Sequence, residues 1–258
     1  MDISAVQAVL AGASGSLVGF TLALVGGGGS ILAVPLLVYL VGMPQAHLAI
    51  GTSAVAVALN AALGLMTHAR AGNVRWPCAS VFAAVGVAGA FAGAAIGKRV
   101  DGQSLLAAFA VLMAVVAVLM LRKGEPVPTT TVRLSRGNAP ALVGAGGATG
   151  LLSGFFGIGG GFLAVPGLMA ATGMGSLNAI GSSLVAVTAF GATTAASYAL
   201  SGLVDWWMAG LFVAGGVLGS LGGARLARGL AARRGVLTRV FAAMLLALAV
   251  FMLVRTLT

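Results

Sequence analysis

"GGGGSILAVP" at 26–35 and "GIGGGFLAVP" at 157–166 are nearly the same phrase, and each lies between strongly apolar stretches of the chain. Each glycine costs about 1 kcal/mol relative to alanine in a helix interior. A cluster of glycines therefore predicts a break in a helix. Two such breaks, 131 residues apart, indicate a duplicated chain in which both halves have kept the break.

Other motifs recur in the same order at nearly the same distance. "AIGTSAVAV" at 49–57 matches "AIGSSLVAV" at 179–187, "GNVRW" at 72–76 matches "GLVDW" at 202–206, and "AFAVLM" at 108–113 matches "VFAAML" at 240–245. The offset stays between 130 and 132 residues. The pattern predicts a first transmembrane repeat at 1–121, a cytoplasmic connecting loop at 122–138 and a second transmembrane repeat at 139–258.

The composition predicts an all-α polytopic membrane protein whose surroundings are the lipid bilayer. Of 258 residues, 60% are hydrophobic and only 7% are charged, whereas soluble domains carry about 25% charged residues. The net charge of +10 comes from short basic runs between apolar segments. Such runs set the orientation of the helices in the membrane. Because this explains the basic charge, we expect no nucleic-acid partner. Ten helical segments are predicted: 4–24, 29–41, 47–68, 76–97, 104–121, 139–156, 160–172, 177–200, 206–226 and 238–255.

The second segment of each half is short, since thirteen helical residues reach only about 20 Å. It could cross the membrane or form a re-entrant hairpin. If it crosses and the N-terminus lies outside, only Lys98, Arg99 and Arg255 of the fourteen basic residues lie outside. A re-entrant segment would instead divide the basic residues almost evenly. The positive-inside rule therefore favours five crossings per half, which makes the two repeats inverted. The eleven residues then placed inside are Arg70, Arg75, Arg122, Lys123, Arg133, Arg136, Arg225, Arg228, Arg233, Arg234 and Arg239.

Glycine-interrupted segments at matching positions of inverted repeats are typical of the substrate site of a transporter. Amides at helix N-termini attract anions, and nearby hydroxyls can donate to an oxyanion. The alternative is that the glycines allow close helix packing, which we favour for Gly89, Gly93, Gly97, Gly215, Gly219 and Gly223 because of their four-residue spacing. The candidate substrate-binding residues are Gly26, Gly27, Gly28, Gly29, Ser30, Pro35, Thr52, Ser53, Gly157, Gly159, Gly160, Gly161, Pro166, Ser182 and Ser183.

The acidic residues argue against several other functions. Asp2, Asp101, Glu125 and Asp205 all fall in predicted loops or termini, so no predicted span carries a carboxylate. A cation-coupled transporter or a membrane hydrolase would need such groups within the membrane. We therefore expect no catalytic residue, no metal and no cofactor. Coupled protons remain a possible partner, with His68 near Arg70 as the candidate carrier, although an interfacial histidine is the simpler interpretation.

The doubled glycine phrase, the following "GTS" or "GSS" helix and the "GxVxW" loop together resemble the sulfite exporter TauE/SafE family of bacterial membrane proteins. The resemblance implies transport of a small anion, sulfite or an organosulfonate such as sulfoacetate, across the plasma membrane by alternating access. A passive anion channel of the same fold is an alternative. A membrane-embedded lipid-phosphate enzyme is another, against which the absent carboxylates argue. Ile158 interrupts the second glycine run and Gly161 stands where the first half has Ser30, so the half-sites should differ.

Overall fold

The structure, a computed structural model, confirms an all-helical membrane protein. It describes residues 5–122, 134–135, 137–230 and 234–257, and these contain helices and turns but no strand. Seven of the described helices are long and apolar enough to cross a membrane. A chain in lipid must satisfy its backbone groups internally, which helices do. Asp2, Lys123, Glu125, Arg133, Arg136, Arg233 and most of the predicted connecting loop lie outside the described residues.

The long helices follow the predicted segments closely, although α9 and α10 are longer than expected. The extensions carry Arg228 and Arg234, so these two residues lie in helices rather than in a loop. The bounds are α1 Ala5–Val25, α3 Ala46–Arg70, α4 Trp76–Gly97, α5 Gly102–Arg122, α6 Ala139–Phe156, α7 Gly161–Thr172, α8 Ser176–Ala199, α9 Trp206–Leu230 and α10 Arg234–Leu257.

The two short segments differ in a way the sequence did not predict. In the first half α1 ends at Val25, and the glycine phrase forms a 3-10 helix, η1 (Gly26–Leu32), followed by α2 (Ala33–Pro35) and a π-helical turn, η2 (Leu36–Leu40). The chain turns back at these glycines, since a carbon added at Gly29 would overlap the backbone of Leu22 and the Gln7 side-chain amide near the start of α1 donates to the Val41 carbonyl. In the second half the phrase forms a turn instead, and α7 follows it. Ile158 is fully buried, and the glycines around it turn the backbone so that this side chain enters the core.

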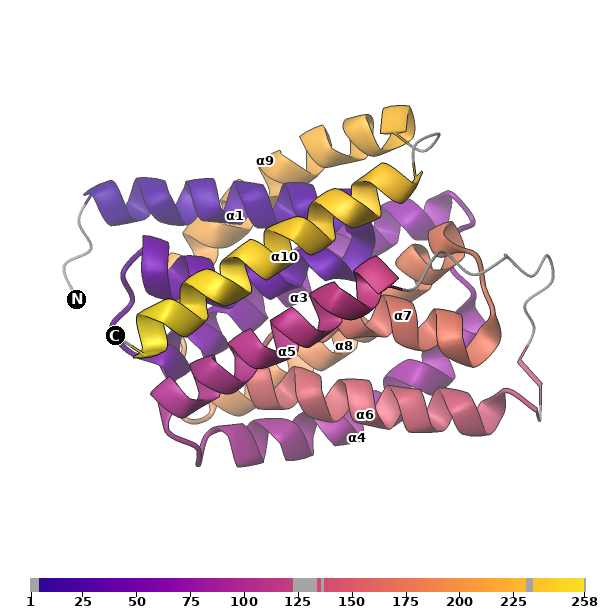
Figure 1. The fold of residues 1–258 in the computed structure, drawn as a ribbon, viewed down its shortest axis with the longest axis horizontal. Helices are drawn as coiled ribbons and strands as arrows, with labels where there is room; N and C mark the ends of the chain where they lie inside the picture. The colour runs from indigo at the N-terminus through magenta and orange to yellow at the C-terminus, as the bar shows by residue number, and fades with distance from the viewer. Residues whose placement is uncertain (1–4, 123–133, 136, 231–233, 258) are drawn as a thin grey trace.

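Every extensive helix pair joins one half of the chain to the other. α1 packs on α9, α4 on α6, α3 on α8 and α5 on α10. Figure 1 shows α4 and α6 along one edge and α1 with α9 along the opposite edge. α3 and α8 are the most deeply buried spans. The predicted repeats are thus not separate bodies, since their helices alternate throughout the bundle.

Glycines bring the backbones of two helix pairs, α4 with α6 and α1 with α9, into contact, as the packing interpretation predicted. A side-chain carbon added at Gly93 of α4 would overlap the Leu151 carbonyl of α6. A carbon added at Gly219 of α9 would likewise overlap the Ser16 carbonyl of α1. Small residues permit this close approach, which supplies packing where lipid gives helices no hydrophobic reason to associate.

Alanine substitution on α9 should separate packing glycines from neutral ones. Gly219→Ala places a methyl group against backbone that cannot yield, so we expect about 1–3 kcal/mol of destabilisation and a lower melting temperature in detergent. Gly210 lies on the same helix and has no atom within 4 Å of an added carbon, so Gly210→Ala should be neutral or slightly stabilising. Equal melting temperatures for the two variants would contradict the packing role.

The helix ends gather at two opposite ends of the bundle. At one end, which we call the α3 N-terminal end, Pro44–His47, Asp101–Gln103, Leu203 and Arg255 line a common pocket. At the other, the turn after α3 contacts the start of α8, where the Arg75 amide donates to Ser182 Oγ. Arg255 lies at the α3 N-terminal end and Arg75 at the other. The inverted orientation in the membrane stays a prediction.

Cysteine labelling can test that orientation at two exposed turn residues that match between the halves, Ala71 and Ser201. In a Cys78→Ala background, Ser201→Cys should react with an impermeant maleimide from outside the cell. Ala71→Cys should react only from the inside. Arg99→Cys, at the same end as Ser201, serves as the control for outside labelling. If Ala71→Cys and Ser201→Cys react from the same side, the inverted arrangement is wrong.

Candidate functional site

The second glycine phrase forms a sharp turn between α6 and α7. Gly157, Gly159 and Gly160 have φ values of +67°, +66° and +67°. Residues with side chains rarely adopt this left-handed conformation, so glycine is required at each of the three positions. The turn ends α6 and starts α7 at Gly161, within the core of the bundle.

This turn is enclosed by α3, α6 and α8. A carbon added at Gly157 would overlap Ile50, and one at Gly159 would lie 2.8 Å from Val57 Cγ1. A carbon at Gly160 would lie 2.7 Å from Ser153 Cβ. All three glycines are buried. The structure therefore shows this turn packed tightly against its neighbours, with no room for a side chain at any of the three glycines.

Hydroxyl groups lie beside the enclosed turn. Ser53 Oγ donates to the Ile50 carbonyl at 2.8 Å, and the Gly157 carbonyl lies 3.5 Å away. Ser183 Oγ donates to the Ile180 carbonyl at 2.8 Å, within its own helix. Ser153 is fully buried next to Gly160, and its hydroxyl has no hydrogen-bond partner. Ser153 is thus the side chain here with a free donor.

Ser153 is not among the candidate residues predicted from the sequence. Its signal was a single hydroxyl in the apolar run "GLLSGFF" at 150–156, one helical turn before the glycines. The first amides of α7, at Gly161 and Phe162, have no intrahelical acceptor because they open the helix. These amides and the Ser153 hydroxyl together can donate to an oxyanion at the turn.

Thr52 and Ser182 have a different environment from the one expected of substrate ligands. Thr52 Oγ1 accepts the Asp205 amide at 3.0 Å, and Ser182 Oγ accepts the Arg75 amide at 2.9 Å. Each hydroxyl thus holds the "GxVxW" loop of the other half, at opposite ends of the bundle. Preceding glycines make room, since a carbon at Gly51 would overlap the Leu203 carbonyl. The "GTS" or "GSS" motif and the loop motif are therefore two parts of one contact.

Removing these acceptors should destabilise the fold. Thr52→Val or Ser182→Ala leaves a loop amide without its partner, which costs about 1–3 kcal/mol when the amide stays buried. The thermal melting temperature in detergent should fall for both. The control is Thr193→Val, because Thr193 donates only to the Ala189 carbonyl of its own helix and should melt as the wild type does. Wild-type melting of Thr52→Val and Ser182→Ala would show that the loop contacts contribute nothing.

The remaining candidates are spread around the turn. Gly26, Gly27 and Gly28 lie in η1, Gly29 packs on the backbone of Thr21 and Leu22, and Ser30 and Pro35 are buried. Pro166 is the sixth residue of α7 and is exposed, so it lies apart from the enclosed turn. The structure thus brings Gly157, Gly159, Gly160, Gly161 and Ser53 together with Ser153.

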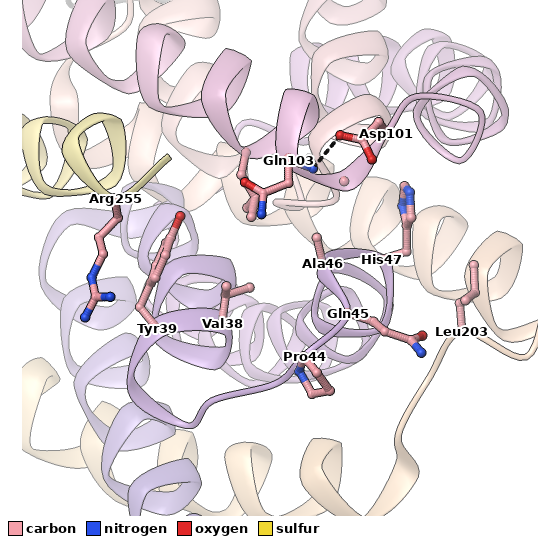
Figure 2. A pocket seen from close by; sticks show the side chains of 12 residues that line it. Val38, Tyr39, Pro44, Gln45, Ala46, His47, Asp101, Gln103, Leu203 and Arg255 are labelled. Atoms are coloured by element: carbon pink, nitrogen blue, oxygen red, sulfur yellow. Dashed lines mark hydrogen bonds between the residues drawn. The ribbon is translucent and has the colours of Figure 1, made fainter. Parts of the chain in front are cut away.

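An open pocket of about 430 Å³ lies at the α3 N-terminal end. Figure 2 shows Asp101 and Gln103 on one side, Ala46 and His47 beside them, and Tyr39 with Arg255 on the far side from His47. Asp101 Oδ2 accepts the Gln103 and Ser104 amides at 3.0 and 3.1 Å and thereby caps α5. Leu203 also lines the pocket. It belongs to the loop whose Asp205 amide donates to Thr52 Oγ1.

Comparison with known proteins gives one family and several relatives. The sequence model of the family described as "Sulfite exporter TauE/SafE" matches residues 11–252. A "Probable membrane transporter protein" of Xylella fastidiosa (strain Temecula1 / ATCC 700964) is 49% identical over 248 residues, which cover 94% of both chains. Another from Haemophilus influenzae is 32% identical over 197 residues, 73% of this chain and 72% of the relative. YdhB of Bacillus subtilis, with the same description, is 26% identical over 213 residues, 81% and 86% of the two chains. No solved structure matches.

Proposed function

Because the chain belongs to the sulfite exporter TauE/SafE family, we propose that it transports a small sulfur oxyanion, sulfite or an organosulfonate, by alternating access. It is a multi-pass membrane protein of a transporter family. We place it in the bacterial plasma membrane with its N-terminus outside, on the charge distribution described above. Its partners are the anion itself and coupled protons.

The observation that carries this proposal is the buried Ser153 hydroxyl facing the start of α7. The hydroxyl has no partner, and Gly160, against which it lies, comes directly before the α7 N-terminus. An unpartnered polar group is unfavourable in an apolar interior. An oxyanion bound between Ser153 and the amides of Gly161 and Phe162 would satisfy all of these donors. The partial positive charge at the helix N-terminus adds to the attraction.

The charges of the spans suit a carrier. Within the seven apolar spans of the described residues the one basic residue is Arg70, at a span end, and Arg255 ends the shorter apolar helix Leu245–Arg255. Neutral donors bind an anion with moderate strength because no full opposite charge holds it. Such a site can also release its ligand, as a carrier must. The enclosed glycine turn then corresponds to the occluded conformation, and the pocket at the α3 N-terminal end to the start of an access path.

Transport by purified protein in liposomes tests the proposal. We expect uptake of labelled sulfite and of methanesulfonate, increased by an imposed pH gradient if protons are coupled. Ser153→Ala should raise the concentration for half-maximal uptake about 10- to 100-fold, the loss of one hydrogen bond to a charged ligand. Ser14→Ala is the matched control, since Ser14 is also buried with an unpartnered hydroxyl but lies in α1, outside the turn.

Three outcomes would contradict the proposal. Equal uptake by empty and by protein-containing liposomes would show that these anions are not substrates. Equal half-maximal concentrations for Ser153→Ala and wild type would move the site away from the turn. Anion flux that follows its own gradient, with no response to an imposed pH gradient, would instead identify a channel.

A further inference from the structure

One buried side chain in the middle of α3 has no role in the fold as described. Asn60 is only 3% exposed, and both its Oδ1 and its Nδ2 lack a hydrogen-bond partner. It is the fifteenth of the 25 residues of α3 and therefore lies close to the centre of the span. Among the described residues it is the one side chain with two such atoms. Such groups destabilise an apolar interior unless a ligand satisfies them.

The matching residue of the other half shows that the fold does not need an amide there. Asn60 packs against Gly216 of α9, where an added side chain would overlap the amide. In the second half the same position is Phe190, which packs against Gly86 of α4 in the same manner. Phe190 is fully buried and stacks on Phe82 at 6.2 Å. An apolar ring thus fills the space beside Gly86, whereas an amide without hydrogen-bond partners fills the matching space beside Gly216.

Phe190 and its position relative to the second glycine phrase show where Asn60 lies along the bundle. Phe190 lies against Gly160, since a carbon added at that glycine would be 3.0 Å from Phe190 Cδ2. The residue that matches Gly160 in the first phrase is Gly29 of η1, which is buried. One turn before Asn60, Val57 contacts Gly159 of the second phrase. Asn60 therefore lies on the central helix at the level of the enclosed glycine turn.

The chemistry of the amide limits what it can bind. Nδ2 donates two hydrogen bonds and Oδ1 accepts them, so the best ligand offers both an acceptor and a donor. The desolvation cost of an ion rises with the square of its charge, and the described spans have no basic side chain away from their ends. A singly charged oxyanion that keeps one proton meets both conditions, because its oxygens accept from Nδ2 and its hydroxyl donates to Oδ1.

We propose that Asn60 contacts the transported ion and, when that ion is sulfite, selects the singly charged hydrogen sulfite over the dianion. This inference rests on the proposed function and adds a residue from the first half to the site. It also gives the half-sites different tasks. The α7 turn supplies donors alone, whereas Asn60 distinguishes hydrogen sulfite from the sulfite dianion.

The test compares Asn60→Leu with wild type in the liposome assay, with equal pH on both sides of the membrane. Hydrogen-sulfite uptake should fall at least about tenfold, while the melting temperature should equal or exceed that of wild type because two unsatisfied groups are gone. Asn60→Ala, which cannot clash with Gly216, should lose uptake to the same degree. Ser14→Ala again serves as control and should keep uptake within about twofold of wild type.

A pH series on the wild-type protein tests the selected form. Sulfite uptake at fixed total concentration should fall as rising pH converts hydrogen sulfite to the dianion, whereas methanesulfonate uptake should stay constant. Wild-type uptake by both Asn60 variants would overturn the contact and leave the proposed function intact. Sulfite uptake that rises with pH would overturn the selectivity. Absence of uptake by the wild-type protein would overturn the proposed function and this inference together.

Discussion

The fold depends on the close approach of helix backbones across the two halves of the chain. α1 meets α9, and α4 meets α6, at glycines whose replacement would bring carbon onto a carbonyl group. In lipid no hydrophobic effect draws helices together, so dispersion contacts at this short range supply much of the association. These two pairs flank α3 and α8 and keep them together at the centre. The enclosed turn at Gly157–Gly160 is closed by those two central helices and by α6.

Local signals in the sequence predicted much of this architecture. Apolar segments gave the helices, and glycines spaced four apart gave the packing faces of α4 and α9. The second glycine phrase adopts the left-handed backbone that its composition suggests. The first phrase, with four consecutive glycines and no buried isoleucine among them, winds into η1 instead. Glycine permits either conformation, so the surrounding core decides between them.

Contacts between distant residues could not be predicted in the same way. Thr52 and Ser182 looked like ligands because they recur beside the glycine phrases. Their partners are loop amides that lie 153 and 107 residues away in the chain. Thr21 and Ser153 are both hydroxyl residues in apolar helices, yet Thr21 donates to the Leu17 carbonyl of its own helix and Ser153 has no partner. The residue type alone does not distinguish them, and the same is true of Asn60.

The alternation of the halves also sets the order in which the molecule can be assembled during synthesis. α1 is made first, but α9, which covers Gly15 and Gly19 of α1, starts only at Trp206. The glycine face of α1 must therefore remain against lipid or the insertion machinery while most of the chain is translated. α4 waits a shorter time, because α6 follows it after one intervening span. Insertion and final packing are thus separated in time, and the last native contacts form only when the C-terminal helices enter the membrane.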